Sequence, residues 1–448
     1  MPERPSARCY ARAVAESRVT RVVRKHGRDV RLVRTCQVQV VAGADAGKKG
    51  LIARPVYRIG THESNDLRLH DETVSKEHLQ IAVEPDGFRV TDLSSSNGTF
   101  LGSVRLGELT LIEAVTLQLG ATSLRLEPSQ EEAEVPSSPR TRFGSVIGAS
   151  VAMRELFAQL ESVAKSDCSL LLEGETGVGK ELVAESVHRE SMRAAGPFVV
   201  VDCAALVGEL VESELFGHVR GAFTGADRER RGLLEAAHGG TLFLDEVGEL
   251  PLGLQKKLLG ALERKRVRPI GATAARPIDI RVLAATHRDL AREVNAGRFR
   301  ADLFYRLAVM RLRIPPLRER LEDLPLLADA FLSELRARHG EAVPAELSAL
   351  TLARMAAQPW PGNVRELRNA FESVVLRAAE RSDVPVEEPY FDLRARVLDE
   401  FERSYFEGLI GEHGRNVRKL ARATQLDRRY LQRILRRHGL LDGTSDDE

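Results

Sequence analysis

The segment 174–181 has the composition of a loop that binds phosphate groups. It reads GETGVGKE, follows the apolar run 170–173, and is followed by a helical pattern. Glycines let backbone N–H groups curl around a β-phosphate, the helix N-terminus adds its dipole, and Lys180 reaches the β- and γ-phosphate oxygens. The general pattern has Ser or Thr after the lysine as a magnesium ligand, whereas this chain has Glu181. From this segment alone, a glycine-rich turn without phosphate remains an alternative.

A second segment, 239–246 (GGTLFLDE), delivers two carboxylates at the end of an apolar strand. Ligands of open α/β sheets bind at the carboxyl ends of the strands. Asp245 is therefore the candidate to hold Mg²⁺, directly or through water, and Glu246 the candidate to orient and deprotonate an attacking water molecule. Two acids at a strand end can also form a solvated turn, but together with the phosphate loop they predict nucleotide hydrolysis.

The pattern around these segments predicts the elements that position them. Between about 143 and 380, apolar strands alternate with helical stretches, which is the signature of a doubly wound α/β sheet. From Leu321 to Arg377 the pattern is helical, which predicts a small lid. The predicted parallel strands are 169–172, 198–201, 241–244 and 280–284.

Between the phosphate loop and the acidic strand lies the hexapeptide GAFTGA, at 221–226. Its glycines give hinge freedom on both sides of Phe223, which is expected at an exposed loop tip. The hexapeptide, the preceding ESELFGH at 212–218 and the glutamate after the lysine resemble the AAA+ domain of bacterial activators of RNA polymerase carrying sigma-54. The resemblance covers residues 146–380.

This resemblance implies roles for further residues. The hexapeptide loop would grip sigma-54, and ATP hydrolysis would pull the closed promoter complex toward the open one. Thr286 in LAATH resembles the sensor I residue that detects the γ-phosphate, and Arg365 in WPGNVREL resembles the sensor II residue. Arg300 and Arg306 in FRADLFYRL match two arginine fingers, which stabilise charge in a neighbouring subunit's site. Hydrolysis would therefore require a ring, which in this family is usually a hexamer.

These motifs predict ATP and Mg²⁺ as cofactors, with Asp245 as the metal ligand, and they predict three residue sets. The catalytic residues are Glu246, Arg300 and Arg306. The ATP-binding set comprises Gly174, Glu175, Thr176, Gly177, Val178, Gly179, Lys180, Glu181, Ala237, His238, Gly239, Gly240, Thr241, Leu242, Phe243, Leu244, Asp245, Glu246, Thr286 and Arg365. The sigma-54 contact set comprises Gly221, Ala222, Phe223, Thr224, Gly225 and Ala226.

The second strand departs from the family pattern at its end. Segment 202–206 reads DCAAL, where the family usually has NCAAL and its Asn pairs with the catalytic glutamate as a switch. Asp202 would place a second carboxylate within hydrogen-bond reach of Glu246, and two such groups repel each other unless one is protonated. We therefore predict altered coupling between nucleotide state and loop movement, with hydrolysis retained.

The region before the ATPase consists of short β-prone runs separated by turn residues. Short strands at this spacing predict an all-β sandwich or barrel. The predicted strands are 36–41, 52–59, 67–69, 79–83, 88–92, 115–119 and 123–126.

Four segments of this region are distinctive: 59–61 (IGT), 64–66 (SND), 74–78 (VSKEH) and 92–100 (DLSSSNGTF). Together they resemble a forkhead-associated (FHA) domain, a sandwich family that binds phosphothreonine at loops on one end. The resemblance implies that Ser75 and Lys76 contact the phosphate. It also implies that Ser96 and Asn97 fix the peptide backbone and that His78 braces the loops.

One residue of the FHA pattern is missing. The family's arginine directly after the glycine is here Thr61, which removes the strongest bidentate phosphate partner. Arg58 lies two residues earlier on the strand. Two interpretations stay open: a phosphothreonine reader, whose ligand is a Ser/Thr kinase substrate or the chain's own phosphorylated segment, or a protein-contact module that no longer reads phosphate.

Near the C-terminus, the pattern predicts two helices that form a helix-turn-helix. Asn416 is the expected N-cap of the first helix and Asp427 that of the second. In the second helix an apolar face opposes a basic one, which resembles the Fis-type domain of the same family and predicts binding of double-stranded DNA. A solvated arginine face is the alternative. The predicted DNA-binding residues are Arg428, Arg429, Gln432, Arg433 and Arg436.

Length and composition limit the number of domains and the classes of protein that are possible. The 448 residues suggest about three domains. A net charge of only +1 provides no global attraction to nucleic acid, and the four cysteines are widely spaced, as is typical of reduced thiols in a cytoplasmic protein. No apolar run is long enough for a membrane span. The predicted parts are a basic disordered extension at 1–35, an FHA domain at 36–127, a linker at 128–142, an AAA+ ATPase with its lid at 143–380, a linker at 381–394, a helix-turn-helix at 395–441 and an acidic tail at 442–448.

The predicted function is thus a sigma-54-dependent activator that binds upstream DNA, drives an ATPase ring and is gated by its FHA domain. The alternative is a DNA-binding regulator whose ATPase domain is a nucleotide-dependent scaffold that does not remodel polymerase. The presence of Glu246, Arg300, Arg306 and Phe223 argues against that alternative. A general AAA+ chaperone would explain neither the hexapeptide nor the helix-turn-helix.

Overall fold

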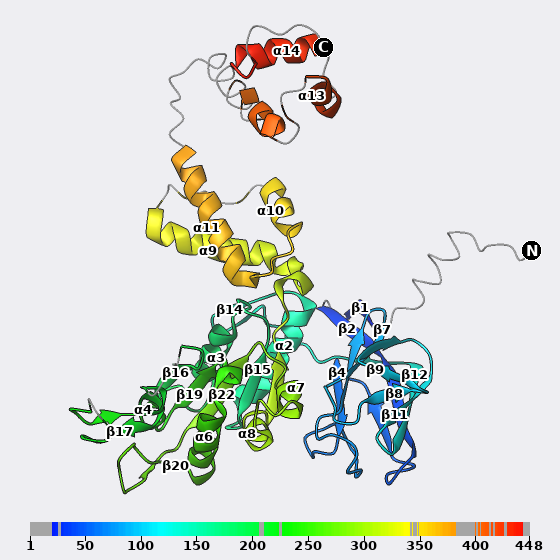
Figure 1. Ribbon diagram of the computed structural model, residues 1–448, viewed down its shortest axis with the longest axis vertical. Coiled ribbons are helices and arrows are strands. Elements are labelled where there is room, and N and C mark those ends of the chain that lie inside the picture. Colours follow the sequence, from blue (N-terminus) through cyan, green and yellow to red (C-terminus); the bar gives the residue numbers. More distant parts are fainter. Residues whose placement is uncertain are drawn as a thin grey trace, which may run out of the picture. The chain divides into compact units, whose positions relative to one another are not determined.

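The computed structural model describes residues 20–25, 28–205, 210–223, 226–340, 343, 347, 349–381, 399, 402–403, 405–411, 414, 417–424 and 428–441. The chain divides into two compact units, Met1–Val375 and Leu376–Glu448. The first unit holds a β-sandwich, an α/β region and a helical lid, and the second unit is helical (Figure 1). The predicted acidic tail at 442–448 and the predicted N-cap residues Asn416 and Asp427 lie outside the described residues.

The β-sandwich consists of two sheets that share one apolar core. The first sheet has the order β1-β2-β12-β11-β8-β9, with β3 paired to β2, and the second has the order β10-β7-β6-β4-β5. In β6 buried and half-buried residues alternate, as expected for a strand with one face in a core. The strands are β1 (Thr20–Lys25), β2 (Arg28–Ala42), β3 (Lys49–Ile52), β4 (Val56–Gly60), β5 (Leu67–Arg68), β6 (Leu79–Glu84), β7 (Gly87–Asp92), β8 (Thr99–Leu101), β9 (Val104–Leu106), β10 (Glu108–Leu111), β11 (Val115–Leu119) and β12 (Thr122–Glu134).

Two sequence predictions need correction here. The sequence predicts a disordered extension at 1–35 and a linker at 128–142, but β1 and the start of β2 lie in the first and the end of β12 in the second. β2 pairs with both β1 and β12, so that the basic and acidic segments meet, and Arg21 Nη2 lies 2.7 Å from Glu132 Oε2. Val33 is fully buried in the same strip. The basic segment and the acidic segment form strands by pairing with each other. The sequence of either segment alone does not indicate this pairing.

The α/β region is built on a parallel five-stranded sheet of order β16-β19-β22-β15-β23. The four predicted strands are confirmed to within two residues of their ends. β23, the edge strand, was missed because its sequence MRLR has no apolar run. The strands are β15 (Leu170–Glu173), β16 (Phe198–Asp202), β19 (Thr241–Asp245), β22 (Arg281–Thr286) and β23 (Met310–Arg313).

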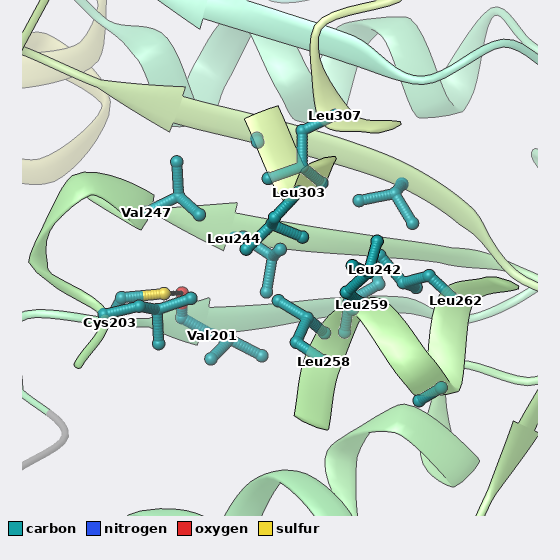
Figure 2. Close-up of a cluster of buried hydrophobic side chains, with 14 of the residues drawn as sticks. Val201, Cys203, Leu242, Leu244, Val247, Leu258, Leu259, Leu262, Leu303 and Leu307 are labelled. Atoms are coloured by element: carbon teal, nitrogen blue, oxygen red, sulfur yellow. Dashed lines mark hydrogen bonds between the residues drawn. The ribbon is translucent and has the colours of Figure 1, made fainter. Parts of the chain in front are cut away.

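Helices cover both faces of this sheet. On one face, α2 and α3 share an apolar cluster with β15 and β22. On the other face, α6 and α8 pack against β16 and β19, as Figure 2 shows for a part of the cluster. Leu303 and Leu307 of α8 are fully buried there, at the i, i+4 spacing of one helix face, whereas Arg306 is exposed. The helices are α2 (Val151–Ala164), α3 (Lys180–Arg189), α4 (Leu210–Phe216), α5 (Leu233–Ala236), α6 (Leu252–Arg264), α7 (Leu290–Asn295) and α8 (Ala301–Leu307).

Smaller elements connect these parts. Short antiparallel pairs are formed by β13 (Arg142–Phe143) with β14 (Val146–Ile147), β17 (Gly217–His218) with β18 (Arg230–Arg231), and β20 (Arg266–Val267) with β21 (Arg276–Pro277). Single 3₁₀ turns are η1 (Val247–Glu249), η2 (Leu317–Glu319) and η3 (Leu321–Asp323).

The predicted helical lid is confirmed. It consists of α9 (Leu324–His339), α10 (Ala349–Ala356) and α11 (Asn363–Arg381), and its core includes Trp360 and Phe371. In the second unit, α13 (Val417–Thr424) and α14 (Arg428–Arg437) share a small apolar core with Phe406. Within the described ranges, none of the helices combines the length and apolar composition that a bilayer-crossing helix needs.

The pH dependence of stability has an identifiable source in Glu155 of α2. Its carboxylate lies 3.2 Å from Arg31 Nε of β2, and burial raises its pKa to about 7 against smaller opposing effects of Arg31 and Arg154. The ordinary value is 4.5, so folding favours the protonated form. The stability that this carboxyl group contributes is therefore fully present below its ordinary pKa and is lost as the pH rises through about 7, by roughly 3 kcal/mol in total.

We therefore expect Glu155→Gln to raise the thermal unfolding midpoint relative to wild type, and this increase should grow between about pH 5 and pH 8, because glutamine cannot ionise. Thermal unfolding of both proteins across that range measures the difference. Glu185→Gln on the surface of α3 is the matched control, with no such trend expected. A difference between Glu155→Gln and wild type that is the same at every pH would contradict the assignment.

Candidate active site

The loop between β15 and α3 has the backbone geometry of a phosphate-binding loop. Gly177 and Gly179 have φ angles of +81° and +102°, which glycine adopts without strain. A Cβ on Gly177 would also lie 2.2 Å from the carbonyl oxygen of Gly362 in the lid. α3 begins at Lys180 directly after the loop, and the first N–H groups of a helix lack acceptors within it, which suits an anion.

The structure brings the phosphate loop and the acidic strand end together through Lys180. This side chain is 7% exposed, and its Nζ lies 3.0 Å from the carbonyl oxygen of Gly174 and 2.9 Å from Glu246 Oε1. Asp245 ends β19 beside Glu246, at the carboxyl edge of the sheet. The two motifs that sequence reasoning combined thus form one site.

The two carboxylates have different electrostatic surroundings. Burial and the neighbouring Glu246 raise the pKa of Asp245. Burial would also raise the pKa of Glu246, but hydrogen bonds from Lys180 and His287 outweigh it and lower that pKa. Glu246 is therefore ionised at neutral pH, which is the form that a general base needs. Asp245 is a half-buried carboxylate whose charged form is disfavoured by its surroundings, so a divalent cation fits there.

His287 contacts Glu246 and was not among the residues predicted from the sequence. Its Nδ1 lies 2.7 Å from Glu246 Oε2, and its backbone N–H donates to the same oxygen at 3.1 Å. Glu246 has a φ of +49°, which is unusual for a residue other than glycine and is held by these contacts. In the sequence, its contact with Glu246 could have been suspected only because His287 directly follows the predicted sensor residue Thr286.

Thr286, the predicted sensor I residue, lies at the end of β22 beside the phosphate loop. It ends β22 opposite Glu173 of β15, and its carbonyl oxygen accepts a hydrogen bond from the N–H of Gly174 at 3.2 Å. Its hydroxyl accepts from the N–H of Arg288 at 3.0 Å and is buried. Thr286 is thus next to the start of the phosphate loop.

The lid closes directly over the phosphate loop through Asn363. Its Nδ2 lies 3.1 Å from both Glu175 Oε2 and the carbonyl oxygen of Thr176, and its Oδ1 accepts from the N–H of Leu317 at 2.8 Å. Arg318 donates to both carboxylate oxygens of Glu175, at 2.6 and 2.8 Å, and these bonds are the main reason that the pKa of Glu175 falls to about 2. Neither Asn363 nor Arg318 was predicted, because the contacts join segments more than 140 residues apart.

A cavity at this junction has the size of a small-molecule site. Its volume is about 370 Å³, within the ~300–1,000 Å³ typical of ligand pockets. Arg365, the predicted sensor II residue, is part of its wall, and its backbone N–H donates to the carbonyl oxygen of Gly177. The wall residues are Thr176, Gly362, Arg365, Glu366, Asn369, Ala370 and Ser373.

The predicted ATP-binding set includes residues that precede and form β19. Ala237, His238, Gly239 and Gly240 precede this strand at its amino end, and a rise of ~3.3 Å per residue puts Gly240 roughly 16 Å from Asp245. Thr241, Leu242, Phe243 and Leu244 are fully buried. The role in ATP binding predicted for 237–244 stays a prediction, and in this structure these residues precede or form the strand that brings Asp245 to the site.

Asp202 does not pair with the catalytic glutamate in this structure. Its Oδ1 accepts hydrogen bonds from the N–H groups of Ala204 at 2.9 Å and Ala205 at 3.2 Å. Glu246 has its own partners in Lys180 and His287. The contact with Glu246 expected from the sequence is thus not made, and the Asp202 carboxylate instead accepts hydrogen bonds from its own turn. A switch role for Asp202 stays a prediction.

Both predicted arginine fingers lie on the surface of the α8 segment. Arg306 is exposed, one residue after Tyr305. Arg300 is the N-cap residue of α8, and its guanidinium donates to both carboxylate oxygens of Asp302, at 2.6 and 3.1 Å. Within this subunit the partners of Glu246 are Lys180 and His287, and action of the two arginines on a neighbouring copy stays a prediction.

The hexapeptide loop holds Phe223 partly in solvent. The ring is 39% exposed and meets the ring of His218 edge-on, with centroids 5.0 Å apart. The N–H of Gly221 donates to the carbonyl oxygen of Ala226 at 2.9 Å, which closes the base of the loop. Thr224 and Gly225 lie outside the described residues. The expectation of an exposed aromatic is confirmed.

In the β-sandwich, three of the four predicted peptide-binding residues lie close together. Ser75 Oγ accepts from the N–H of Ser96 at 3.0 Å, and Asn97 Nδ2 donates to the carbonyl oxygen of Thr73 at 2.7 Å. The predicted brace is also present, since His78 Nδ1 accepts from the N–H of Ser75 at 3.0 Å. Lys76, the fourth residue, is exposed in the same loop.

The residues near the missing arginine are engaged elsewhere. The N–H of Thr61 donates to the carbonyl oxygen of Ser75 at 3.1 Å. Arg58 lies 3.7 Å from Glu173 of the ATPase sheet, so its guanidinium is turned to that domain. Arg58 thus does not replace the guanidinium that Thr61 lacks.

In the second unit, α14 has the predicted division into two faces. Leu431, Ile434 and Leu435 are buried in the small core. Arg428, Arg433 and Arg436 are exposed, Gln432 is half-buried, and only the backbone of Arg429 is described. The exposed basic face is therefore present, and Arg433 within it also has an interaction partner.

Comparisons with protein families agree with this site. Residues 146–313 match the sigma-54 interaction domain, and residues 318–388 match the AAA+ ATPase lid domain. Residues 39–130 match the cytoplasmic domain of the inner membrane component of T3SS.

Comparisons with individual proteins cover most of the chain. It is 39% identical to the regulatory protein LuxO of Vibrio cholerae serotype O1, over 80% of this chain and 73% of LuxO. It is 42% identical to the anaerobic nitric oxide reductase transcription regulator NorR of Salmonella paratyphi C, over 75% of this chain and 72% of NorR. A crystal structure of NtrX from Brucella abortus in complex with ATP is 34% identical, with a TM-score of 0.50 over 67% of this chain and 70% of NtrX. The chain therefore contains an AAA+ ATPase domain and belongs to the family of sigma-54-dependent transcriptional activators.

Proposed function

We propose that this protein hydrolyses ATP in a ring of its own subunits and uses that energy to convert sigma-54 RNA polymerase from the closed to the open promoter complex. One observation carries the proposal. The domain that pairs Lys180 with Glu246 at 2.9 Å also presents a 39% exposed Phe223 on a glycine-bounded loop. An ATPase site and an exposed aromatic tip in one domain fit a machine that turns hydrolysis into force on a protein partner.

The residues of the site divide the work of hydrolysis. Mg²⁺, held by Asp245, would neutralise charge on the β- and γ-phosphates. Lys180 leaves Glu246 to bind the phosphates, which frees that carboxylate to orient and deprotonate water. Thr286 would detect the γ-phosphate, and Arg365 would report the nucleotide to the lid. Asp202 would modify the coupling between these events and the Phe223 loop.

The β-sandwich would be the sensor that gates the ring, as an FHA domain. Ser75, Ser96 and Asn97 support a phosphothreonine site because they already share a hydrogen-bonded loop cluster. Thr61 favours the alternative, a protein-contact module that does not read phosphate. Titration of the protein with phosphothreonine peptides, with Thr61→Arg as the variant that restores the guanidinium, separates the two.

The basic face of α14 would bind double-stranded DNA upstream of the promoter and raise the local concentration of the ring. Arg428 and Arg436 support this because they are exposed on one helix in the second unit. Binding through such arginines displaces counterions, so the affinity should fall steeply as salt is raised.

Transcription in vitro from a sigma-54 promoter tests the proposal. With sigma-54 RNA polymerase and ATP, the full-length protein should produce transcripts, and with ADP it should produce none. The ATPase rate per subunit should rise with protein concentration, because each site needs a neighbour's arginine. A protein that binds ATP and promoter DNA but leaves the promoter closed at every concentration would establish the scaffold alternative.

A further inference from the structure

Glu77 and Arg311 form a buried ion pair between the β-sandwich and the ATPase sheet. Glu77 lies in the loop before β6 and its side chain is 0% exposed, while Arg311 lies on the edge strand β23 and is 7% exposed. The guanidinium donates to both carboxylate oxygens, at 2.6 and 3.1 Å. Two buried charges are tolerated only when they are paired in good geometry, so each domain supplies what the other's buried charge requires.

Asn295 makes a second contact with the same part of the sandwich. It ends α7, and its Nδ2 donates to the carbonyl oxygens of Glu77 at 2.8 Å and Leu93 at 2.7 Å. Leu93 is 2% exposed and belongs to the apolar cluster of the ATPase core, although it comes from the sandwich. A side-chain amide that satisfies two backbone carbonyls fixes the position of both loops.

A third contact is made by rings. His62, in the loop after β4, stacks on Tyr305 of α8, with centroids 3.2 Å apart and planes inclined by 6°. Arg311 in turn lies over the ring of Phe304, 4.5 Å from its centroid. His62 of the sandwich and Arg311, the ion-pair partner of Glu77, therefore both contact α8, the helix that carries Arg306.

These three contacts bracket the arginine fingers. Asn295 precedes Arg300 in the chain, Tyr305 is adjacent to Arg306, and Arg311 follows both fingers. A finger must reach into a neighbouring subunit, and a segment held at three points has less freedom to do so. In this docked arrangement the guanidinium of Arg300 is also occupied within its own subunit by Asp302.

We propose that the β-sandwich restrains the arginine-finger segment of its own chain through Glu77, and that the docked domain keeps ATP hydrolysis below its full rate. This deepens the proposed function, because it rests on Arg300 and Arg306 acting in trans. The regulated element is the segment 295–311, which contains both arginine fingers. The restraining residue directly follows Ser75 and Lys76, so the docking surface is continuous with the candidate ligand loop.

Hydrogen exchange of the full-length, nucleotide-free protein tests the docking. Glu77→Gln and Arg311→Gln should each speed exchange in 62–78 and 295–311 by at least ~10-fold, since each leaves a buried charge without its partner. The double variant should exchange more slowly than either single variant, because it leaves no unpaired charge in the interface. Exchange in β11 and β12 should stay at the wild-type rate, which shows that the sandwich is folded.

The ATPase rate tests the restraint. At a protein concentration below full assembly, Glu77→Gln should hydrolyse ATP at least ~3-fold faster than wild type, because released fingers reach a neighbour more often. Glu63→Gln, the same change on an exposed residue of the same sandwich face, is the matched control and should leave both measurements at wild-type values.

Three other outcomes would each contradict one part of the proposal. Unchanged exchange in both single variants would exclude the docking contact. Faster exchange together with an ATPase rate at or below wild type would exclude the restraint. A wild-type protein that hydrolyses no ATP would contradict the proposed function instead, and the exchange data would still decide whether the two domains are docked.

Discussion

Replacing Arg306 with alanine is expected to lower the rate of ATP hydrolysis by ~10³-fold or more, the usual contribution of an arginine finger, while ATP binding is retained. The reason is geometric. Arg306 is exposed on α8, whereas Leu303 and Leu307 fix that helix to the core, so the loss of the guanidinium leaves the fold and the subunit's own phosphate loop intact. Steady-state hydrolysis and equilibrium ATP binding measure the two effects separately.

A mixing experiment distinguishes action in trans from a local structural effect. Glu246→Gln subunits have intact fingers but no base, and Arg306→Ala subunits have an intact base but lack the finger. Mixed together, the two inactive proteins should regain measurable hydrolysis. Arg298→Ala is the matched control, since Arg298 is a surface residue of the same segment paired with Glu293 at 2.7 Å, and it should keep near wild-type activity. No recovery on mixing would contradict the finger assignment.

Replacing Phe223 with alanine should abolish open-complex formation and leave ATP hydrolysis within about twofold of wild type. The ring is 39% exposed and contacts His218, so little of the fold depends on it. A central aromatic contact with a protein partner is worth ~2 kcal/mol or more, and its loss would disengage the loop from sigma-54. Promoter melting with sigma-54 RNA polymerase and hydrolysis on the same preparation provide the two measurements.

Met192→Ala is the matched control for Phe223→Ala. Met192 is 77% exposed on the same domain, so this variant also removes a surface apolar side chain, at a site with no proposed partner. It should support both hydrolysis and promoter opening. Normal promoter opening by Phe223→Ala would refute the assignment of the hexapeptide as the polymerase-contacting loop.

The ATPase site could be predicted from the sequence because its information is local. The phosphate loop, the strand that ends in Asp245 and Glu246, and the strand that ends in Thr286 are each marked by a short run of residues. Parallel strands then bring their carboxyl ends to one edge of the sheet. The predicted set also extends back along β19, whose residues 241–244 are buried in the core, and their role in ATP binding stays a prediction.

Contacts between distant segments could not be predicted in the same way. Asn363 and Arg318 gain their roles only when the lid is folded over Glu175, and Glu77 gains its role only when the sandwich meets β23. A single glutamate or asparagine in a loop has no distinctive spacing. The pairing of β2 with the end of β12 was missed for the same reason, because it joins two segments that each look too polar to fold.

The close approach of Gly177 to Gly362 has a mechanical consequence. A Cβ on Gly177 would lie 2.2 Å from the Gly362 oxygen, and the N–H of Arg365 donates to the Gly177 oxygen at 3.2 Å. Backbone here touches backbone, with no flexible side chain between to absorb a displacement. A shift of the phosphate loop on nucleotide binding or release would therefore displace the first turn of α11 as well. The lid and the loop would then move together at Gly177 and Gly362.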